Sequence, residues 1–163
     1  MRSPETARLV VGIMVCLGAV FPASSLGAQE AAASEGMNAY RSDTSFAATM
    51  ERVEPEVRAR GLFVMRVLDH AAGAAQVGRS LNPNSVVLFG NPQIGSQVMQ
   101  CAPRAGIDLP QKLLLWEADG EVFVAYNDPK YLGRRHSIMG CDEVLARVAS
   151  NLDGLARAVA GME

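Results

Sequence analysis

The amino-acid sequence predicts a two-layer α+β fold, in which helices pack on one face of a mixed β-sheet. Three apolar, β-favouring runs each end at an Asp or Asn that precedes a helical segment. An Asp-Gly pair at 119–120 separates two β-prone runs and predicts a hairpin. Apolar residues recur at helical spacing over 145–159. A hairpin inside an otherwise alternating pattern indicates the α+β class.

The three strand-to-helix junctions are the clearest local feature. The expected strands that enter them are 62–68, 86–89 and 122–126. The expected capping residues that follow are Asp69, Asn91 and Asp128. A side-chain oxygen at such a position accepts a hydrogen bond from the first turn of a helix, and proline suits the first helical position. Pro92 and Pro129 occupy that position in two of the junctions, so each junction predicts a helix start.

The other elements follow from periodicity and from chain breakers. We expect a short edge strand at 37–41 and then a helix from Phe46 to Gly61, which Pro55 either kinks or restarts. Further helices are expected at 71–80, 92–101, 130–136 and 145–159, and the hairpin strands at 112–117 and 122–126. The predicted order of elements is β-α-β-α-β-α-β-β-α-α.

Residues 1–28 have the three-part plan of a secretory signal peptide: two arginines, an apolar run from Leu9 to Phe21, and a segment of small or weakly polar residues. A membrane anchor is the alternative, but the apolar run is shorter than the ~20 residues that span a bilayer. Residues 29–35 are predicted to be a flexible tether and 36–163 a single α+β domain. We therefore expect an exported protein, periplasmic or secreted, with no stable membrane span after cleavage.

Charge argues against a nucleic-acid partner. The formal net charge is −2, and loss of residues 1–28 removes two Arg and one Glu, which leaves −3. Phosphate backbones are bound by basic faces, and the chain contains no run of Lys and Arg longer than a pair. We expect no nucleic acid among the partners.

Four motifs resemble the domain of unknown function 302 family, in the expected order along the chain. They are Asp69-His70-Ala71 with Ala74 and Val77-Gly78; Leu88-Phe89-Gly90-Asn91-Pro92 with Gly95 and Met99; Asp108-Leu109-Pro110 with Leu113 and Trp116-Glu117; and Tyr126-Asn127-Asp128-Pro129 with Tyr131-Leu132 and Arg135-His136. The resemblance covers residues 36–160 and implies a fold similar to TATA-binding-protein-like α+β domains, in a homodimer. It implies no activity, because none is established for the family, and Cys101 and Cys141 depart from its pattern.

A polar ligand site is predicted if the strands entering the three junctions lie side by side and point the same way. Their ends then gather six residues at one sheet edge: His70, Gly90, Asn91, Asn127, Asp128 and His136. Helix N-termini at that edge present unpaired N–H groups to an anion or a polar ligand. The alternative is that Asp69 and its counterparts only cap helices and that the histidines hold the fold together.

Three functions remain open at this point. The first is a homodimeric binding protein for a small polar ligand or a metal, with no identified cofactor. A metal site would combine the two histidines with Cys101, Cys141 or Met99. The second is a small hydrolase or isomerase with His70 or His136 as general base. The third is a thiol redox module, because an exported compartment permits a disulfide between Cys101 and Cys141.

Overall fold

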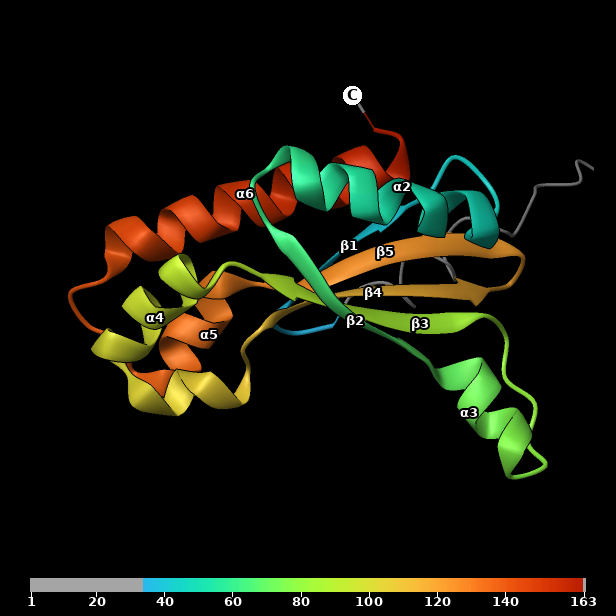
Figure 1. The fold of residues 1–163 in the computed structure, drawn as a ribbon, viewed down its shortest axis with the longest axis horizontal. Helices are drawn as coiled ribbons and strands as arrows, with labels where there is room; N and C mark the ends of the chain where they lie inside the picture. The colour runs from blue at the N-terminus through green and yellow to red at the C-terminus, as the bar shows by residue number, and fades with distance from the viewer. Residues whose placement is uncertain (1–33, 163) are drawn as a thin grey trace, which may run out of the picture.

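The computed structural model describes residues 34–162 (Figure 1). The predicted signal peptide at 1–28 lies outside the described residues, as do the first five residues of the predicted tether. The tether's last two residues are described, and Ser34 forms an isolated antiparallel bridge with Met37.

The order of elements is the predicted one, with a short 3₁₀ helix added before the hairpin. The elements are β1 (Met37–Arg41), α2 (Phe46–Ala59), β2 (Phe63–Asp69), α3 (His70–Gln76), β3 (Asn84–Gly90), α4 (Pro92–Cys101), η1 (Pro103–Ile107), β4 (Gln111–Ala118), β5 (Glu121–Asn127), α5 (Pro129–His136) and α6 (Asp142–Ala160). The α+β class is therefore confirmed. Helix α2 continues through Pro55 as one element.

The five strands form one sheet in the order β1-β5-β4-β3-β2. Every neighbouring pair is antiparallel, whereas the sequence predicted a mixed sheet. The reason lies in the connections. Helices α3 and α4 do not cross the sheet between their flanking strands but lie beyond the strand ends, so the chain re-enters the sheet from the end at which it left (Figure 1).

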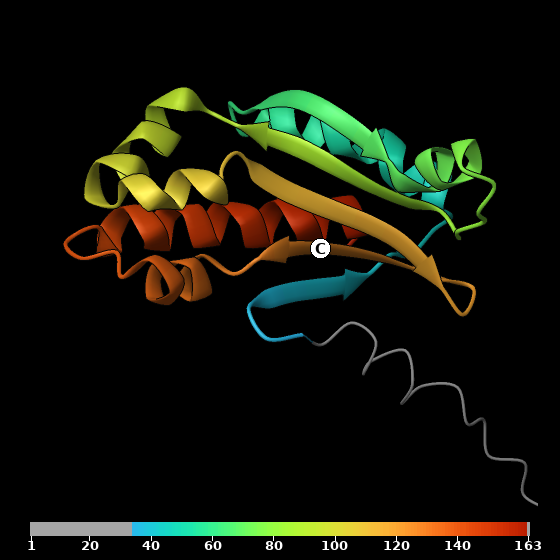
Figure 2. The same cartoon turned by 90° about the horizontal axis from the view of Figure 1, so that it is seen from below.

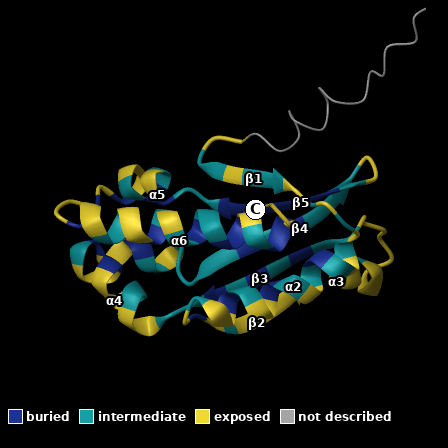
Figure 3. Cartoon of the chain, turned by 90° about the horizontal axis from the view of Figure 1, so that it is seen from above, coloured by how far each residue is buried: buried dark blue, intermediate teal, exposed yellow. Residues whose placement is uncertain are grey.

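Helices α2 and α6 cover one face of the sheet, and the main core lies between them and the strands (Figures 1 and 3). Its fully buried side chains include Phe89, Leu113 and Leu115 from the strands and Leu152 and Leu155 from α6. Burial of such side chains contributes about 1.5–3 kcal/mol each. Because successive residues of a strand point to opposite faces, this packing also determines which residues lie on the face away from the helices.

All three predicted helix caps are formed. The Oδ1 atom of Asp69 accepts a hydrogen bond from the N–H of Ala72 at 2.9 Å. Asn91 accepts one from Gln93 at 2.9 Å. Asp128 does the same for Lys130 at 3.0 Å, so local sequence signals placed these helix starts correctly.

Candidate functional site

The sheet does not gather the six predicted site residues at one edge. Strand β2 is antiparallel to β3, with Phe63 opposite Gly90 and Asp69 opposite Ser85. His70 therefore lies at the end of the sheet opposite to Gly90 and Asn91, where it is exposed at the start of α3. The predicted convergence is wrong for His70, because it assumed that neighbouring junction strands run in parallel.

Strands β3 and β5 do end on the same side of the sheet, but β4 lies between them. The polar groups there already have structural partners. Asn91 caps α4 through Oδ1 and donates through Nδ2 to the backbone oxygen of Gly61 at 3.2 Å. Asp128 caps α5. Capping thus accounts for both side chains without a ligand.

His136 is buried, with a side chain 7% exposed, and its Nε2 atom lies 2.5 Å from Oδ2 of Asp108. Arg135 binds the other carboxylate oxygen of Asp108 at 3.3 Å. These contacts join the end of α5 to the segment after η1, two parts of the chain that carried separate family motifs. This buried contact stabilises the packing of α5 against that segment.

Cys101 and Cys141 are paired in a disulfide, with Cα atoms 6.4 Å apart. The bond ties the last residue of α4 to the residue that precedes α6. Among the residues that the structure describes, no group of three or more His, Cys, Asp or Glu side chains is placed to hold a metal ion.

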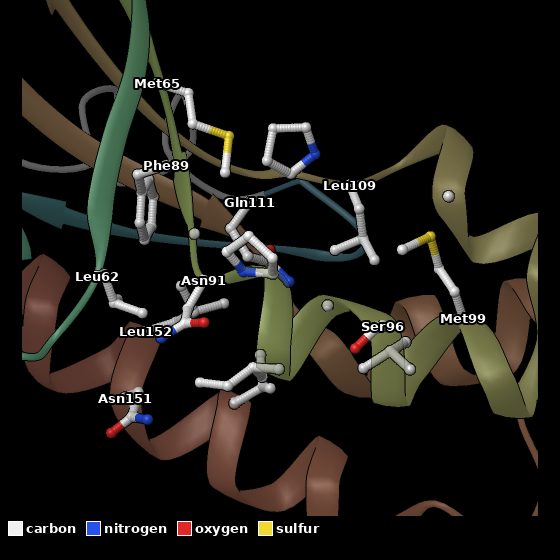
Figure 4. Close-up of a pocket in the computed structure, with 18 residues that line it drawn as sticks. Leu62, Met65, Phe89, Asn91, Ser96, Met99, Leu109, Gln111, Asn151 and Leu152 are labelled. Atoms are coloured by element: carbon white, nitrogen blue, oxygen red, sulfur yellow. The ribbon is translucent and has the colours of Figure 1, made fainter.

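A cavity of about 410 Å³ lies where β3 passes into α4 (Figure 4). Phe89, Gly90 and Asn91 form its floor, α4 and the segment 106–111 form two walls, and α6 contributes Val148, Asn151 and Leu152. Met65 on β2 and Met99 on α4 also line it. Of the predicted site residues, Gly90 and Asn91 belong to this cavity, and the other four do not.

The lining of the cavity is almost entirely apolar and includes no charged side chain. Its polar side chains are Asn91, Ser96, Gln111 and Asn151. The amide of Asn91 is already hydrogen-bonded through both Oδ1 and Nδ2. The hydroxyl of Ser96 donates to the backbone oxygen of Gln93 at 3.3 Å. The amides of Gln111 and Asn151 make no side-chain hydrogen bond to other described residues, which leaves them to a bound molecule or to water.

Sequence reasoning missed the cavity because its walls come from four separate segments of the chain. A signal was nevertheless present in the glycines at 90, 95 and 106, all of which line it. A glycine leaves room that any other side chain would occupy. A Cβ atom on Gly95 would meet nothing closer than a methyl of Leu109 at 4.0 Å.

The most perturbed ionisable groups lie elsewhere, where β1 and β5 meet α6. Asp153 accepts hydrogen bonds from the hydroxyls of Tyr40 and Tyr126 and from Arg157. The Tyr40 hydrogen bond, helped by Arg157, lowers the pKa of Asp153. Burial, with the nearby Asp153 carboxylate, raises the pKa of Tyr126 and of Tyr40 above 10.0. The cluster joins α6 to the sheet, and none of its four residues lines the cavity at the β3–α4 junction.

The model of the family described as "Domain of unknown function DUF302" matches residues 38–158. The chain belongs to the DUF302 family. The family predicted from the four sequence motifs is therefore confirmed. A solved structure, an uncharacterised conserved DUF302 protein from Bacillus stearothermophilus, superposes with a TM-score of 0.70 over 76% of this chain and 97% of that one. At 19% identity, this DUF302 neighbour shows a shared fold.

Curated relatives of this DUF302 chain include proteins named fluoride-specific ion channels. FluC 1 of Brucella suis and FluC 1 of Brucella abortus are each 40% identical to it over 104 residues, 63% of this chain. Those residues make up 41% and 38% of the two relatives, so the chain spans about two-fifths of their length. In the described part of this chain, no helix combines the length and apolar character needed to cross a membrane.

Replacement of Tyr126 by Phe should reduce the loss of stability at alkaline pH. Tyrosine ionises near pH 10 in an unfolded chain, whereas the folded state holds Tyr126 protonated to higher pH. Its contribution is therefore complete below pH ~10 and declines as the pH rises further. Between pH 8 and 11, the free energy of unfolding should fall by about 1 kcal/mol less in Tyr126→Phe than in the wild type, measured by urea denaturation. Equal falls in both proteins would contradict this assignment.

Removal of the disulfide should destabilise the protein. The bond closes a loop with a sequence separation of 40 residues, so its loss in Cys101→Ser/Cys141→Ser should lower the free energy of unfolding by about 4 kcal/mol. Denaturant unfolding with and without a dithiol reductant measures this. The reductant should shift the wild-type midpoint and leave the double variant unchanged, and an unshifted wild type would show that the bond contributes no stability.

Proposed function

We propose that this chain is an exported, homodimeric binding protein that holds a small neutral molecule in the cavity at the β3–α4 junction. The observation that carries this proposal is the cavity itself, about 410 Å³ and lined by no charged side chain. Ligand sites are typically concave, mainly apolar and about 300–1,000 Å³, with few polar groups that fix the ligand's orientation.

The chemistry of the lining selects the class of ligand. A charged ligand would lose its hydration there without gaining a counter-charge, which costs several kcal/mol. A largely apolar molecule gains from burial against Phe89, Leu152 and the two methionines. The free amides of Gln111 and Asn151 suit one or two hydrogen-bonding groups on it. This proposal replaces the polar ligand or metal expected from the sequence, because the side chains on which that expectation rested do not converge.

The enzymatic alternative has less support. His70 is exposed at the far end of the sheet, and His136 is enclosed against Asp108. A general base needs to reach the proton that it removes, and neither ring lines the cavity. Export is supported by the sequence plan of residues 1–28 and by the disulfide, which oxidising compartments favour.

The proposal is tested with N-phenyl-1-naphthylamine, a neutral apolar molecule that fluoresces when it leaves water. We expect saturable binding by the wild type and at least a tenfold weaker affinity in Gly95→Leu, which places a side chain in the cavity from a helical position. Leucine has a higher helix propensity than glycine, so the fold is retained.

Gly73→Leu is the matched control, because Gly73 lies on α3 with nothing within 4 Å of an added Cβ. It should bind the probe as the wild type does. A probe that does not saturate the wild type, or that binds Gly95→Leu equally well, would rule out this cavity as the site.

The curated relatives favour a second candidate function, an accessory domain for a membrane channel. Proteins named fluoride channels contain a segment similar to this chain within a longer sequence. The match covers 104 residues of this chain, whereas the structure leaves only residues 1–33 and 163 undescribed. Most of the matched residues therefore belong to the folded domain. Among the residues that the structure describes, that domain has no helix long and apolar enough to cross a membrane.

This second candidate predicts that the purified protein changes the rate of fluoride efflux from vesicles that contain a separately encoded fluoride channel. A fluoride electrode measures the efflux, and heat-denatured protein is the control. An unchanged rate at protein concentrations well above that of the channel would exclude a direct effect on it.

A further inference from the structure

One row of apolar residues crosses all five strands on the face of the sheet that points away from α2 and α6. Residues directly opposite one another in an antiparallel sheet share a face. In the sheet, Leu68 lies opposite Val86, Val86 opposite Leu114, Leu114 opposite Ala125, and Ala125 opposite Ala39. None of the five belongs to the core cluster beneath the helices, whereas their chain neighbours Val87, Leu113 and Leu115 do. We call the surface around this row the open face.

The rows on either side combine apolar and charged residues. In one, Trp116 lies opposite Phe123, and the two rings stack with centroids 5.0 Å apart. Arg41 continues this row on β1. In the other, Leu88 lies between Arg66 and Lys112. The open face thus has an apolar centre with charges toward its margin, which is the usual anatomy of a protein interface.

The described helices leave this face uncovered. Seen from below, the strands are in view, while α2 and α6 lie behind them and α3, α4 and α5 lie beyond the strand ends (Figure 2). Leu68 is 39% exposed, and Val86, Leu114 and Trp116 are each partly exposed, whereas Ala125 and Phe123 on β5 are buried. An apolar surface that stays partly exposed over β2, β3 and β4 marks a site of interaction.

The rest of the chain offers little to cover the open face once the predicted signal peptide is removed. Five residues, Gln29 to Ala33, then precede the described part, and three of them are alanines. Fully extended, they reach ~17 Å, less than the ~24 Å width of a five-stranded sheet. They also carry no large apolar side chain to set against the row.

We propose that a second copy of this chain covers the open face, so that the two sheets pack against each other with the helices outside. This inference rests on the homodimer of the proposed function and assigns its interface. Strands of seven residues in a five-stranded sheet give a face of roughly 24 by 24 Å. The accessible area of its side chains exceeds this projection and approaches the ~800 Å² per partner of a standard interface. Sheets that pack in this way lie about 10 Å apart.

The interface is tested on the exported, processed protein by two measurements at matched concentrations. Light scattering after size exclusion gives the mass. Acrylamide quenching reports on Trp116, which is the single tryptophan of the chain and lies on the open face. We expect a wild-type dimer with a shielded tryptophan. Leu114→Glu places a charge at the centre of the row and should weaken the dimer on the order of 100-fold or more, with stronger quenching.

Ala47→Glu is the control variant, because it adds the same charge at an exposed position in the first turn of α2. It should remain a dimer. Circular dichroism establishes that Leu114→Glu is folded, and Leu114→Asn is the milder variant to use if it is not.

Each other outcome overturns the inference. A wild-type monomer would do so, whether the open face stays bare or residues 9–21 are retained and cover it. A dimer that persists in a folded Leu114 variant, with tryptophan quenching unchanged, would place the interface elsewhere, for example at the exposed edge of β2. Binding of N-phenyl-1-naphthylamine is measured separately, so the ligand proposal can stand while the interface fails.

Discussion

The antiparallel pairing of all five strands is the constraint on which the rest of this structure depends. Because β2 runs opposite to β3, the two helices that follow these strands lie at opposite ends of the sheet. Because β3 and β4 are joined at one end through α4 and η1, α4 and η1 lie beyond the ends of these strands and enclose a cavity there. The same register sends alternate side chains to the helices and to the open face.

The cavity lies at the seam between two hydrophobic clusters. Phe89 and Leu152 belong to the main core under α2 and α6. A smaller cluster holds α4 and η1 through Val98, Ala102, Ala105, Ile138 and Cys141, beside the disulfide. Glycines at 90, 95 and 106 lie where the two clusters face each other and leave the volume unfilled. A cavity between two hydrophobic clusters can admit a ligand without disruption of either cluster. For this reason, small molecules commonly bind at such boundaries.

Several polar residues that look functional in the sequence serve the fold. Asp69, Asn91 and Asp128 satisfy N–H groups at helix starts, which otherwise have no intrahelical partner. Asp108 and His136 join η1 to α5, and Asp153 collects two tyrosines and an arginine between the sheet and α6. The contact with Asp108 offsets the cost of burying the polar ring of His136. The two surfaces on which the proposals rest, the cavity and the open face, are mainly apolar.

Local sequence patterns were enough to predict the five strands, the α-helices, their order, the helix caps, the hairpin and the family, because each of these depends on residues close together in the chain. Pro92 after Asn91, or Asp119 before Gly120, acts within a turn and needs no distant partner. Which strand ends meet became known only from the three-dimensional structure, which separates His70 from Asn91 and brings Phe89, Leu109 and Leu152 around one cavity. The direction of a strand depends on whether the helix before it crosses the sheet or stays at the end of the strands. Long-range packing determines the path of that helix, and a local sequence pattern carries no information about it.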